Sequence, residues 1–179
     1  MMNDVFFDLE TQNLFQDVGG KPNITRLRVA CAVTWSETRD DFFVYWEKDV
    51  PDLLEELKSA QRVIGFNLKE FDYLVLLPYA AGFNLATLPT LDLMLDISRT
   101  LGFRLSLDAI ASASLGTSKS ADGVQSVQWF RQGLLDKVAE YCKTDVDITR
   151  RVFEFGREHG YVNYRSRLDS ILKVKVNWK

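Results

Sequence analysis

The sequence predicts an α/β domain in which a mixed β-sheet is flanked by helices. Three observations lead to this prediction. Residues 5–46 contain three runs rich in β-branched and aromatic residues, separated by polar loops. Residues 62–67 form a short apolar run, which is typical of a strand buried between two layers in a parallel arrangement. Residues 134–159 carry apolar side chains at steps of three and four, which predicts one long amphipathic helix.

The N-terminal part is predicted to begin with an antiparallel meander. Its strands cover residues 5–11, 27–35 and 42–46, and a polar, glycine-containing loop joins the first two. A first helix follows over residues 51–60. Pro51 is a helix-start signal, and the leucines that follow it form one apolar face.

The middle of the chain alternates short strands with helices. The strand at 62–67 leads into a helix at 71–77, which a proline limits. A further short strand is expected within 87–93, before a helix that ends at Gly102. Another helix is expected over 107–115, because a serine precedes it as a candidate N-cap and a glycine follows it as a candidate C-cap.

The last third contains one long polar stretch, residues 117–132, which is predicted to be a loop. Loops this long tend to be functional or mobile, so it either covers a substrate or forms a surface excursion. Beyond the long helix, residues 161–165 and 172–179 predict a C-terminal β-hairpin with one basic face. Lysines there serve either to protect an edge strand or to contact nucleic acid. The chain is treated as a single domain, residues 1–179.

Composition restricts the classes of protein. Of the 179 residues, 46% are hydrophobic, which is enough for one packed core. Cys31 and Cys142 form no disulfide or zinc pattern, which favours a reducing, cytoplasmic setting. No basic leader or bilayer-length apolar run occurs, so a secreted or membrane protein is not expected. A net charge of −3 argues against phosphate binding, unless acidic residues are neutralised by bound cations.

Two carboxylates on the first strand are candidate metal ligands. Side chains alternate along a strand, so Asp8 and Glu10 should point the same way and Leu9 the opposite way. Adjacent carboxylates repel each other and are commonly offered to a cation such as Mg²⁺. An Asp-x-Glu triplet alone is weak evidence, because two solvated acids at a strand end would look the same.

Two further acids lie on predicted helices. Asp72 falls in the first turn of its helix, where the helix dipole favours a negative charge and many ordinary acids occur. Asp145 lies in the middle of the apolar stripe of the long helix, one turn after Tyr141. No Lys or Arg shares that stripe, and a buried carboxylate is costly unless it is paired. Asp145 therefore requires a cation from elsewhere.

Three spaced motifs occur in order along the chain: DLE at 8–10, NLKEFD at 67–72 and YCKTD at 141–145. This set resembles the DEDD superfamily of 3′-to-5′ exonucleases, which has a ribonuclease H-like fold. Glu140 stands where the histidine branch carries its histidine, so the chain is similar to the tyrosine branch. It looks most like stand-alone exonuclease domains related to the proofreading domain of family B DNA polymerases.

The resemblance implies a role for each residue of the motifs. The implied metal ligands, for two Mg²⁺ or Mn²⁺ ions, are Asp8, Glu10, Asp72 and Asp145. The implied substrate-contacting residues are Thr11, Asn67 and Phe71. Tyr141 would orient the attacking water. Tyrosine ordinarily titrates near pH 10 and is a poor general base at neutral pH, so orientation is the expected role, rather than proton removal.

The implied activity is hydrolysis of phosphodiester bonds at the 3′ end of single-stranded DNA, with release of nucleoside 5′-monophosphates. Two metal ions suit this reaction, because one activates water and the other stabilises the departing oxygen. An exoribonuclease of the same branch is the nearest alternative, and a nucleic-acid-binding module without activity is another. Any helicase or polymerase that works with this chain is expected to be a separate partner.

Overall fold

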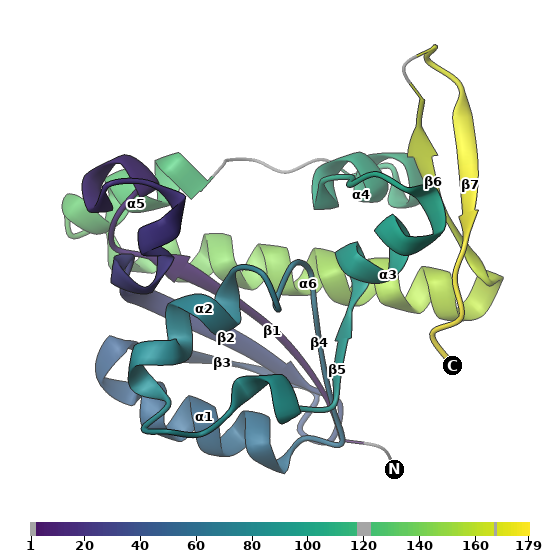
Figure 1. Ribbon diagram of the computed structural model, residues 1–179. Helices are drawn as coiled ribbons and strands as arrows, with labels where there is room; N and C mark the ends of the chain where they lie inside the picture. Colours follow the sequence, from purple (N-terminus) through teal and green to yellow (C-terminus); the bar gives the residue numbers. More distant parts are fainter. Residues whose placement is uncertain (1–2, 118–122, 167) are drawn as a thin grey trace.

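The centre of the computed structural model, which describes residues 3–117, 123–166 and 168–179, is a five-stranded sheet (Figure 1). Its strand order is β3-β2-β1-β4-β5. The strands are β1 (Asp4–Thr11), β2 (Val29–Ser36), β3 (Asp41–Trp46), β4 (Arg62–Gly65) and β5 (Thr90–Asp92). β1 is antiparallel to β2 and parallel to β4, so the predicted mixed sheet and its N-terminal meander are confirmed.

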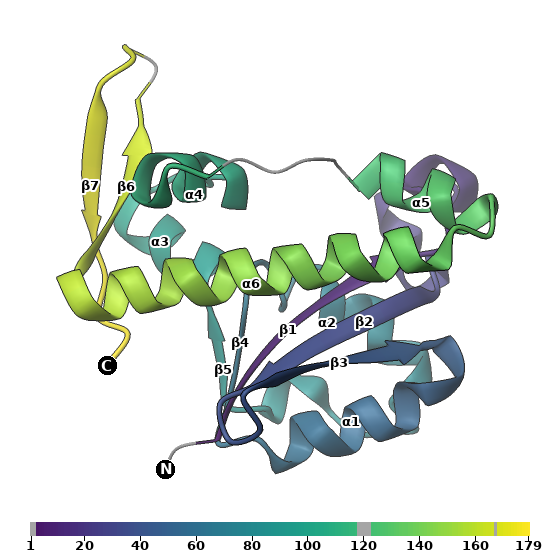
Figure 2. The same cartoon turned by 180° about the vertical axis from the view of Figure 1, so that it is seen from behind.

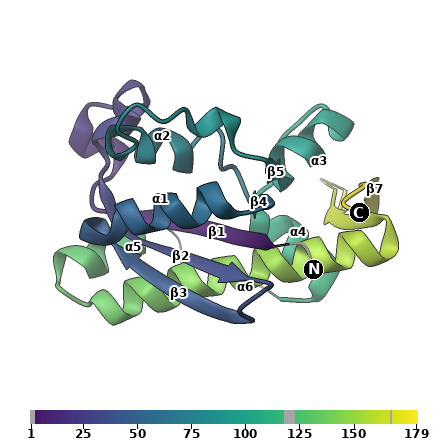
Figure 3. The same cartoon turned by 90° about the horizontal axis from the view of Figure 1, so that it is seen from below.

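Helices cover both faces of this sheet (Figures 1 and 3). One face carries α1 (Val50–Ser59) and α2 (Asp72–Leu76). The other carries α3 (Leu93–Leu101), α4 (Leu107–Leu115) and α6 (Leu135–His159). The view from behind shows α6 lying across the face of the sheet and extending beyond it towards the C-terminal end of the chain (Figure 2). Among the described helices, none has both the length and the apolar composition that a membrane span requires.

The alternation along β1 divides its side chains between the two cores. Val5, Phe7 and Leu9 belong to the core under α1 and α2, while Phe6 belongs to the core under α6. Residues 8 and 10 share the parity of Phe6, so their carboxylates point towards α6. This confirms that Leu9 faces the opposite layer.

The prediction of a loop over 117–132 is wrong for most of that stretch. Residues Gly123–Arg131 form the helix α5, and residues 118–122 lie outside the described part of the chain. The stretch is polar, but Ser126 and Val127 are buried, and the Trp129 ring meets the Tyr141 ring edge-on at 6.2 Å. Packing against α6 therefore stabilises a helix that the local composition does not predict.

The loop expected after β1 also contains helical turns. Two short 3₁₀ helices occur there, at Phe15–Val18 and Lys21–Arg26. The first is closed by Gly19, whose φ of 84° is left-handed and suits glycine. Pro22 lies in the first turn of the second, where its fixed φ is compatible with a helix.

The predicted helix signals around α4 are confirmed. The Ser106 hydroxyl accepts a hydrogen bond from the Ala109 N–H at 3.1 Å, and Gly116 ends the helix with a φ of 69°. The preceding helix ends at Gly102 as expected. The strand expected within 87–93 is shorter than predicted, because α3 already begins at Leu93.

The C-terminal hairpin is present as a separate two-stranded sheet, β6 (Tyr161–Arg165) and β7 (Ile171–Lys175) (Figure 1). Its second strand is shorter than predicted. The tail turns inward, where the Trp178 ring stacks on Phe153 at 6.1 Å and its indole N–H donates to the Asp96 carboxylate at 2.7 Å. The tail is therefore fixed to α3 and α6.

Candidate active site

One pocket of about 380 Å³ contains every residue for which a site role was predicted. It lies where β1, the loop after β4, α2, α5 and α6 meet. The residues with predicted roles that line it are Asp8, Glu10, Thr11, Asn67, Phe71, Asp72, Tyr141 and Asp145. Folding thus brings together three motifs that are far apart in the sequence, while the role of each residue stays a prediction.

The acids of the pocket are largely buried. Glu10, Asp72 and Asp145 are each less than a tenth exposed, and Asp8 is half-buried. The Asp72 carboxylate accepts a hydrogen bond from the Leu9 N–H at 3.2 Å, which ties the start of α2 to β1. The four carboxylates are therefore held on adjoining elements rather than in flexible loops.

Burial changes the ionisation of two of these acids. The pKa of Glu10 is raised well above its ordinary value, mainly by burial and next by the charge of Asp8. The pKa of Asp72 is raised well above its ordinary value for the same two reasons, in the same order. Without a cation, both side chains tend to keep a proton, because ionisation would add negative charge to a desolvated pocket.

The donor set fits divalent cations that prefer oxygen ligands. Among the described residues that line the pocket, none is a Lys or Arg that could neutralise the acids. Carboxylate oxygens of Asp8 and Glu10 and the sulfur of Cys142 all lie within 4.8 Å of one another. Mg²⁺ and Mn²⁺ favour carboxylate ligands, so the acids are suited to hold them.

Cys142 is a neighbour of the site that the sequence analysis missed. Its thiol lies 3.4 Å from the Asp8 carbonyl oxygen and 3.7 Å from the Asp8 Oδ2, and it donates towards both. Burial raises the pKa of this thiol well above its ordinary value, and the nearby Cys31 raises it further. The neutral thiol can therefore support Asp8. Both cysteines are free.

The wall formed by α5 holds Tyr141. The Tyr141 side chain is less than a tenth exposed, and the Trp129 ring packs against it. Gly123 and Val124, at the start of α5, line the pocket directly. A tyrosine supported on one side by an aromatic ring, with its other side on the pocket, is suited to holding a small polar group in a fixed position.

Asp92 organises the loop that carries the second motif, and the sequence analysis did not single it out. Its carboxylate accepts hydrogen bonds from the N–H groups of Asn67 at 2.9 Å and Lys69 at 3.0 Å. It also caps α3 by accepting from the Leu95 N–H at 3.2 Å. The only sequence signal was an Asp between a predicted strand and a predicted helix, which is a common N-cap position.

The geometry around Asn67 leaves a polar atom for a ligand. Asn67 adopts a left-handed φ of 72°, which asparagine tolerates better than most residues. Its Oδ1 is buried and finds no hydrogen-bond partner among the described residues. A buried polar atom without a partner is costly, so a ligand that donates to it would be stabilised.

The other two predicted substrate-contacting residues form part of the wall. The Phe71 ring meets the Phe15 ring edge-on at 6.1 Å, which leaves an aromatic surface on the pocket. The Thr11 hydroxyl donates to the Asn13 carbonyl oxygen at 2.9 Å, so it is held in one orientation.

Comparisons with known proteins agree with this architecture. Residues 5–155 match the family model RNase_H_2, of the RNase_H superfamily. A solved structure with the same fold is the family B DNA polymerase from the hyperthermophilic archaeon Pyrobaculum calidifontis, with a TM-score of 0.68 and 14% sequence identity. That match covers 87% of this chain and 24% of the polymerase chain. Comparison with curated proteins found no match.

These matches confirm the ribonuclease H-like fold that the motifs implied, including the mixed sheet flanked by helices. Nucleases with this fold use divalent metal ions, in keeping with the acidic cluster in the pocket. Since the family match spans most of the sequence, this chain belongs to the RNase H superfamily, whose fold indicates a hydrolytic nuclease.

Proposed function

We propose that this protein is a metal-dependent 3′-to-5′ exonuclease of the tyrosine branch of the DEDD superfamily, acting on single-stranded DNA. One observation supports the proposal most strongly. Four carboxylates from three distant segments line one pocket together with Tyr141, in the combination that the motifs implied. The products would be nucleoside 5′-monophosphates.

In this proposal the acids form the cation site. Asp8, Glu10, Asp72 and Asp145 hold two divalent cations, which supply activation of water and stabilisation of the departing 3′ oxygen. The raised pKa values of Glu10 and Asp72 support this role, because a cation would replace the protons that burial favours. The Cys142 thiol keeps the Asp8 carboxylate in position.

The remaining residues of the pocket position the reacting groups. The Tyr141 hydroxyl orients the attacking water by a hydrogen bond, and the packing of Trp129 limits the rotation of its ring. Asn67 offers its buried Oδ1 to a donor on the terminal nucleotide. Phe71 offers a surface on which the terminal base can stack.

A direct test uses end-labelled DNA and RNA oligonucleotides of matched sequence, with Mg²⁺, Mn²⁺ or a chelator. The proposal expects a ladder of shortened DNA products that requires the metal and is absent with Asp145→Asn. A ladder from RNA alone would instead identify an exoribonuclease. If neither polymer is shortened under any condition, the proposal is wrong and a binding module becomes the better interpretation.

A further inference from the structure

A second cavity lies outside the acid-lined pocket, between the α3–α4 connection and β6. Its volume is about 460 Å³, and it is lined by Phe103, Arg104, Leu105, Tyr164, Arg165 and Ser166. The described lining thus contains two arginines and no acid. The first pocket has the opposite character, with four acids and no Lys or Arg among its described lining residues.

An exposed aromatic ring stands at this cavity. Phe103 is 49% exposed, and its ring meets the Tyr164 ring edge-on at 6.0 Å. Tyr164 is buried and packs against one side of the Phe103 ring, so the other side of that ring remains exposed to solvent. Supported and exposed aromatic rings are the surfaces on which single-stranded nucleic acids stack their bases, without regard to sequence.

The two arginines at the cavity pair with exposed carboxylates. Arg104 pairs with Glu70, and Arg165 pairs with Asp169 at 2.8 Å; all four side chains are at least 41% exposed. Exposed ion pairs contribute little, so a phosphate can displace the carboxylate at low cost. Arginine also matches the geometry of phosphate oxygens with two parallel donors.

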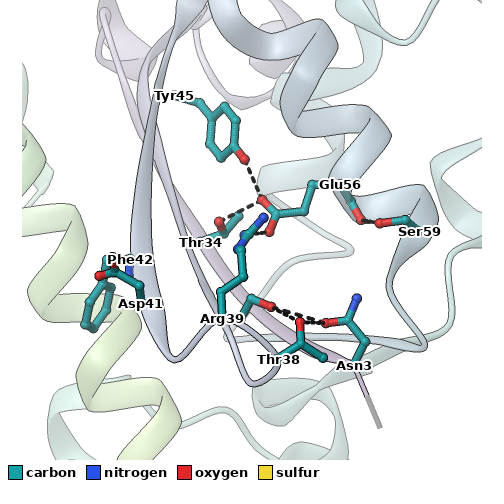
Figure 4. Close-up of polar contacts among 10 residues, drawn as sticks. Asn3, Thr34, Thr38, Arg39, Asp41, Phe42, Tyr45, Glu56 and Ser59 are labelled. Carbon is teal, nitrogen blue, oxygen red and sulfur yellow. Dashed lines mark hydrogen bonds and ion pairs between the residues drawn. The ribbon is translucent and has the colours of Figure 1, made fainter. Parts of the chain in front are cut away.

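A different arginine shows the contrast. Arg39, in the turn between β2 and β3, also lies against an exposed phenylalanine, with its guanidinium 4.0 Å from the Phe43 ring centre. It pairs with Glu56, whose side chain is only 9% exposed and accepts further hydrogen bonds from Thr34 and Tyr45 (Figure 4). Because that guanidinium pairs with a largely buried carboxylate, it is less available to bind a phosphate.

The ion pair between Arg104 and Glu70 connects the cavity to the candidate active site. Glu70 directly precedes Phe71 and Asp72, which line the first pocket. A strand whose 3′ end lies in that pocket can therefore leave past Arg104 and reach Phe103 and Arg165. On the neighbouring strand β7, the exposed Lys173 and Lys175 lie on the same face of the hairpin as Arg165, because they pair with Asn163 and Tyr161.

We propose that the cavity around Phe103, Arg104 and Arg165 is a second binding subsite for single-stranded nucleic acid, which holds the part of the strand upstream of its 3′ end. Phe103 stacks on a base, while the arginines bind backbone phosphates. The inference rests on the proposed exonuclease function, because it assumes that the 3′ end occupies the acid-lined pocket. It implies that long strands bind more tightly than short ones.

The test measures binding of dye-labelled single-stranded DNA to the full chain carrying Asp145→Asn, which prevents cleavage. A trinucleotide is compared with a strand of about a dozen nucleotides. Adding Phe103→Ala should lower the ratio of long-strand to trinucleotide affinity by about tenfold, the scale of one lost stacking contact. Adding Arg165→Gln should reduce the slope of log affinity against log salt by about 0.7, the value for one phosphate contact on a single strand.

Phe43→Ala is the matched control, because it removes another exposed ring that also lies beside an arginine. It should change neither the affinity ratio nor the salt slope. The inference is overturned if the Phe103 and Arg165 variants, checked for folding by thermal unfolding, retain both wild-type quantities. That result is also expected if the cavity instead binds a protein partner. If Phe103→Ala does not fold, the Arg165→Gln slope decides.

Cleavage by the chain without Asp145→Asn is measured separately. If the wild-type chain shortens a strand from its 3′ end but the affinity ratio is unchanged in the variants, the proposed exonuclease function is supported and the second subsite is refuted. If the variants lose the length dependence of binding but the wild-type chain cleaves nothing, the second subsite is supported and the exonuclease function is refuted.

Discussion

Glu56 on α1 and the acids of the candidate active site are largely buried carboxylates in different parts of the fold, and their surroundings differ. Glu56 on α1 accepts hydrogen bonds from Thr34 at 2.8 Å and Tyr45 at 2.7 Å and pairs with Arg39 (Figure 4). Its charge is compensated by a cation from the chain itself. The described residues that line the acid pocket include no Lys or Arg.

In the proposed function, this difference distinguishes an acid that stabilises the fold from acids that bind a ligand. A buried carboxylate with an arginine and two hydroxyl donors is satisfied within the fold. Buried carboxylates that face one another raise each other's pKa and have a lower energy once a cation binds. The pKa values of Glu10 and Asp72 are raised first by burial and next by the charge of Asp8, so their ionised forms cost stability unless a cation is present.

The largest expected effect comes from replacing one carboxylate with an amide in the acid pocket and, as the comparison, at Glu56. Asp145→Asn should reduce cleavage below detection, because loss of a metal ligand exceeds the roughly 10- to 100-fold cost typical of a supporting partner. Glu56→Gln should leave cleavage unchanged and lower the free energy of unfolding by about 1–3 kcal/mol. Rates on a labelled oligonucleotide and urea unfolding curves measure both. An Asp145→Asn protein that trims DNA at the wild-type rate would contradict the comparison.

Two tyrosines provide the next contrast. Tyr141→Phe should lower the cleavage rate by about 10²-fold, the scale of a group that positions a proton-transfer partner. Tyr45→Phe removes the hydroxyl that donates to Glu56 and should leave the rate unchanged. Single-turnover rates at saturating enzyme separate this effect from substrate binding. If the two variants cleave at equal rates, Tyr141 does not have the proposed role of orienting the attacking water.

Asp92 allows a test of positioning. Asp92→Asn should weaken two hydrogen bonds to the loop of the second motif and lower cleavage by about tenfold. Asp4→Asn is its control, since Asp4 is equally buried but pairs with Arg62 at 2.5 Å, away from the pocket lining. Cleavage rates at several Mg²⁺ concentrations should show a higher metal requirement for the Asp92 variant alone. Loss of stability without this shift would limit Asp92 to a structural role.

The smallest expected effect is the pH dependence of stabilisation by Mg²⁺. The ordinary pKa values are 4.5 for Glu10 and 3.8 for Asp72, and both are raised in the folded protein. Below the ordinary pKa values, protonation of the two acids contributes its full stabilisation to the folded, metal-free protein. This contribution is lost as the pH rises through the raised pKa values of the folded state. A cation replaces the protons, so Mg²⁺ should raise the melting temperature by a few degrees more at about pH 8 than at about pH 5.

Thermal unfolding with Mg²⁺ and with chelator measures this difference. Asp145→Asn should reduce the effect of the metal at both pH values, whereas Glu56→Gln should not. A melting temperature that responds to Mg²⁺ equally at both pH values would show that the protons of the acid pocket do not compete with the metal.

The elements that the sequence predicted well are those whose periodicity is local. The stripe along α6 is enough to place Asp145 on the buried face of its helix, and the alternation along β1 is enough to place Asp8 and Glu10 on one face of their strand. The helix α5 was missed because its stability comes from packing against Tyr141 and its neighbours, rather than from its own polar sequence.

The missed neighbours of the site depend on contacts between distant segments. The Cys142 thiol meets Asp8 across a sequence separation of 134 residues. Asp92 reaches Asn67 because β5 pairs with β4, so that Gly65 lies opposite Asp92. Neither contact leaves a periodic signal in the sequence. The single-domain organisation and the roles of the individual site residues remain predictions.

We propose that the four acids form one site for two divalent cations. Electron paramagnetic resonance of Mn²⁺ counts free and bound ions directly and needs no nucleic acid. We expect two ions to bind per chain near pH 8, fewer to bind to Asp145→Asn, and two to bind to Glu56→Gln. Mn²⁺ that remains free at millimolar protein concentration, or that binds equally to wild type and Asp145→Asn, would contradict the claim.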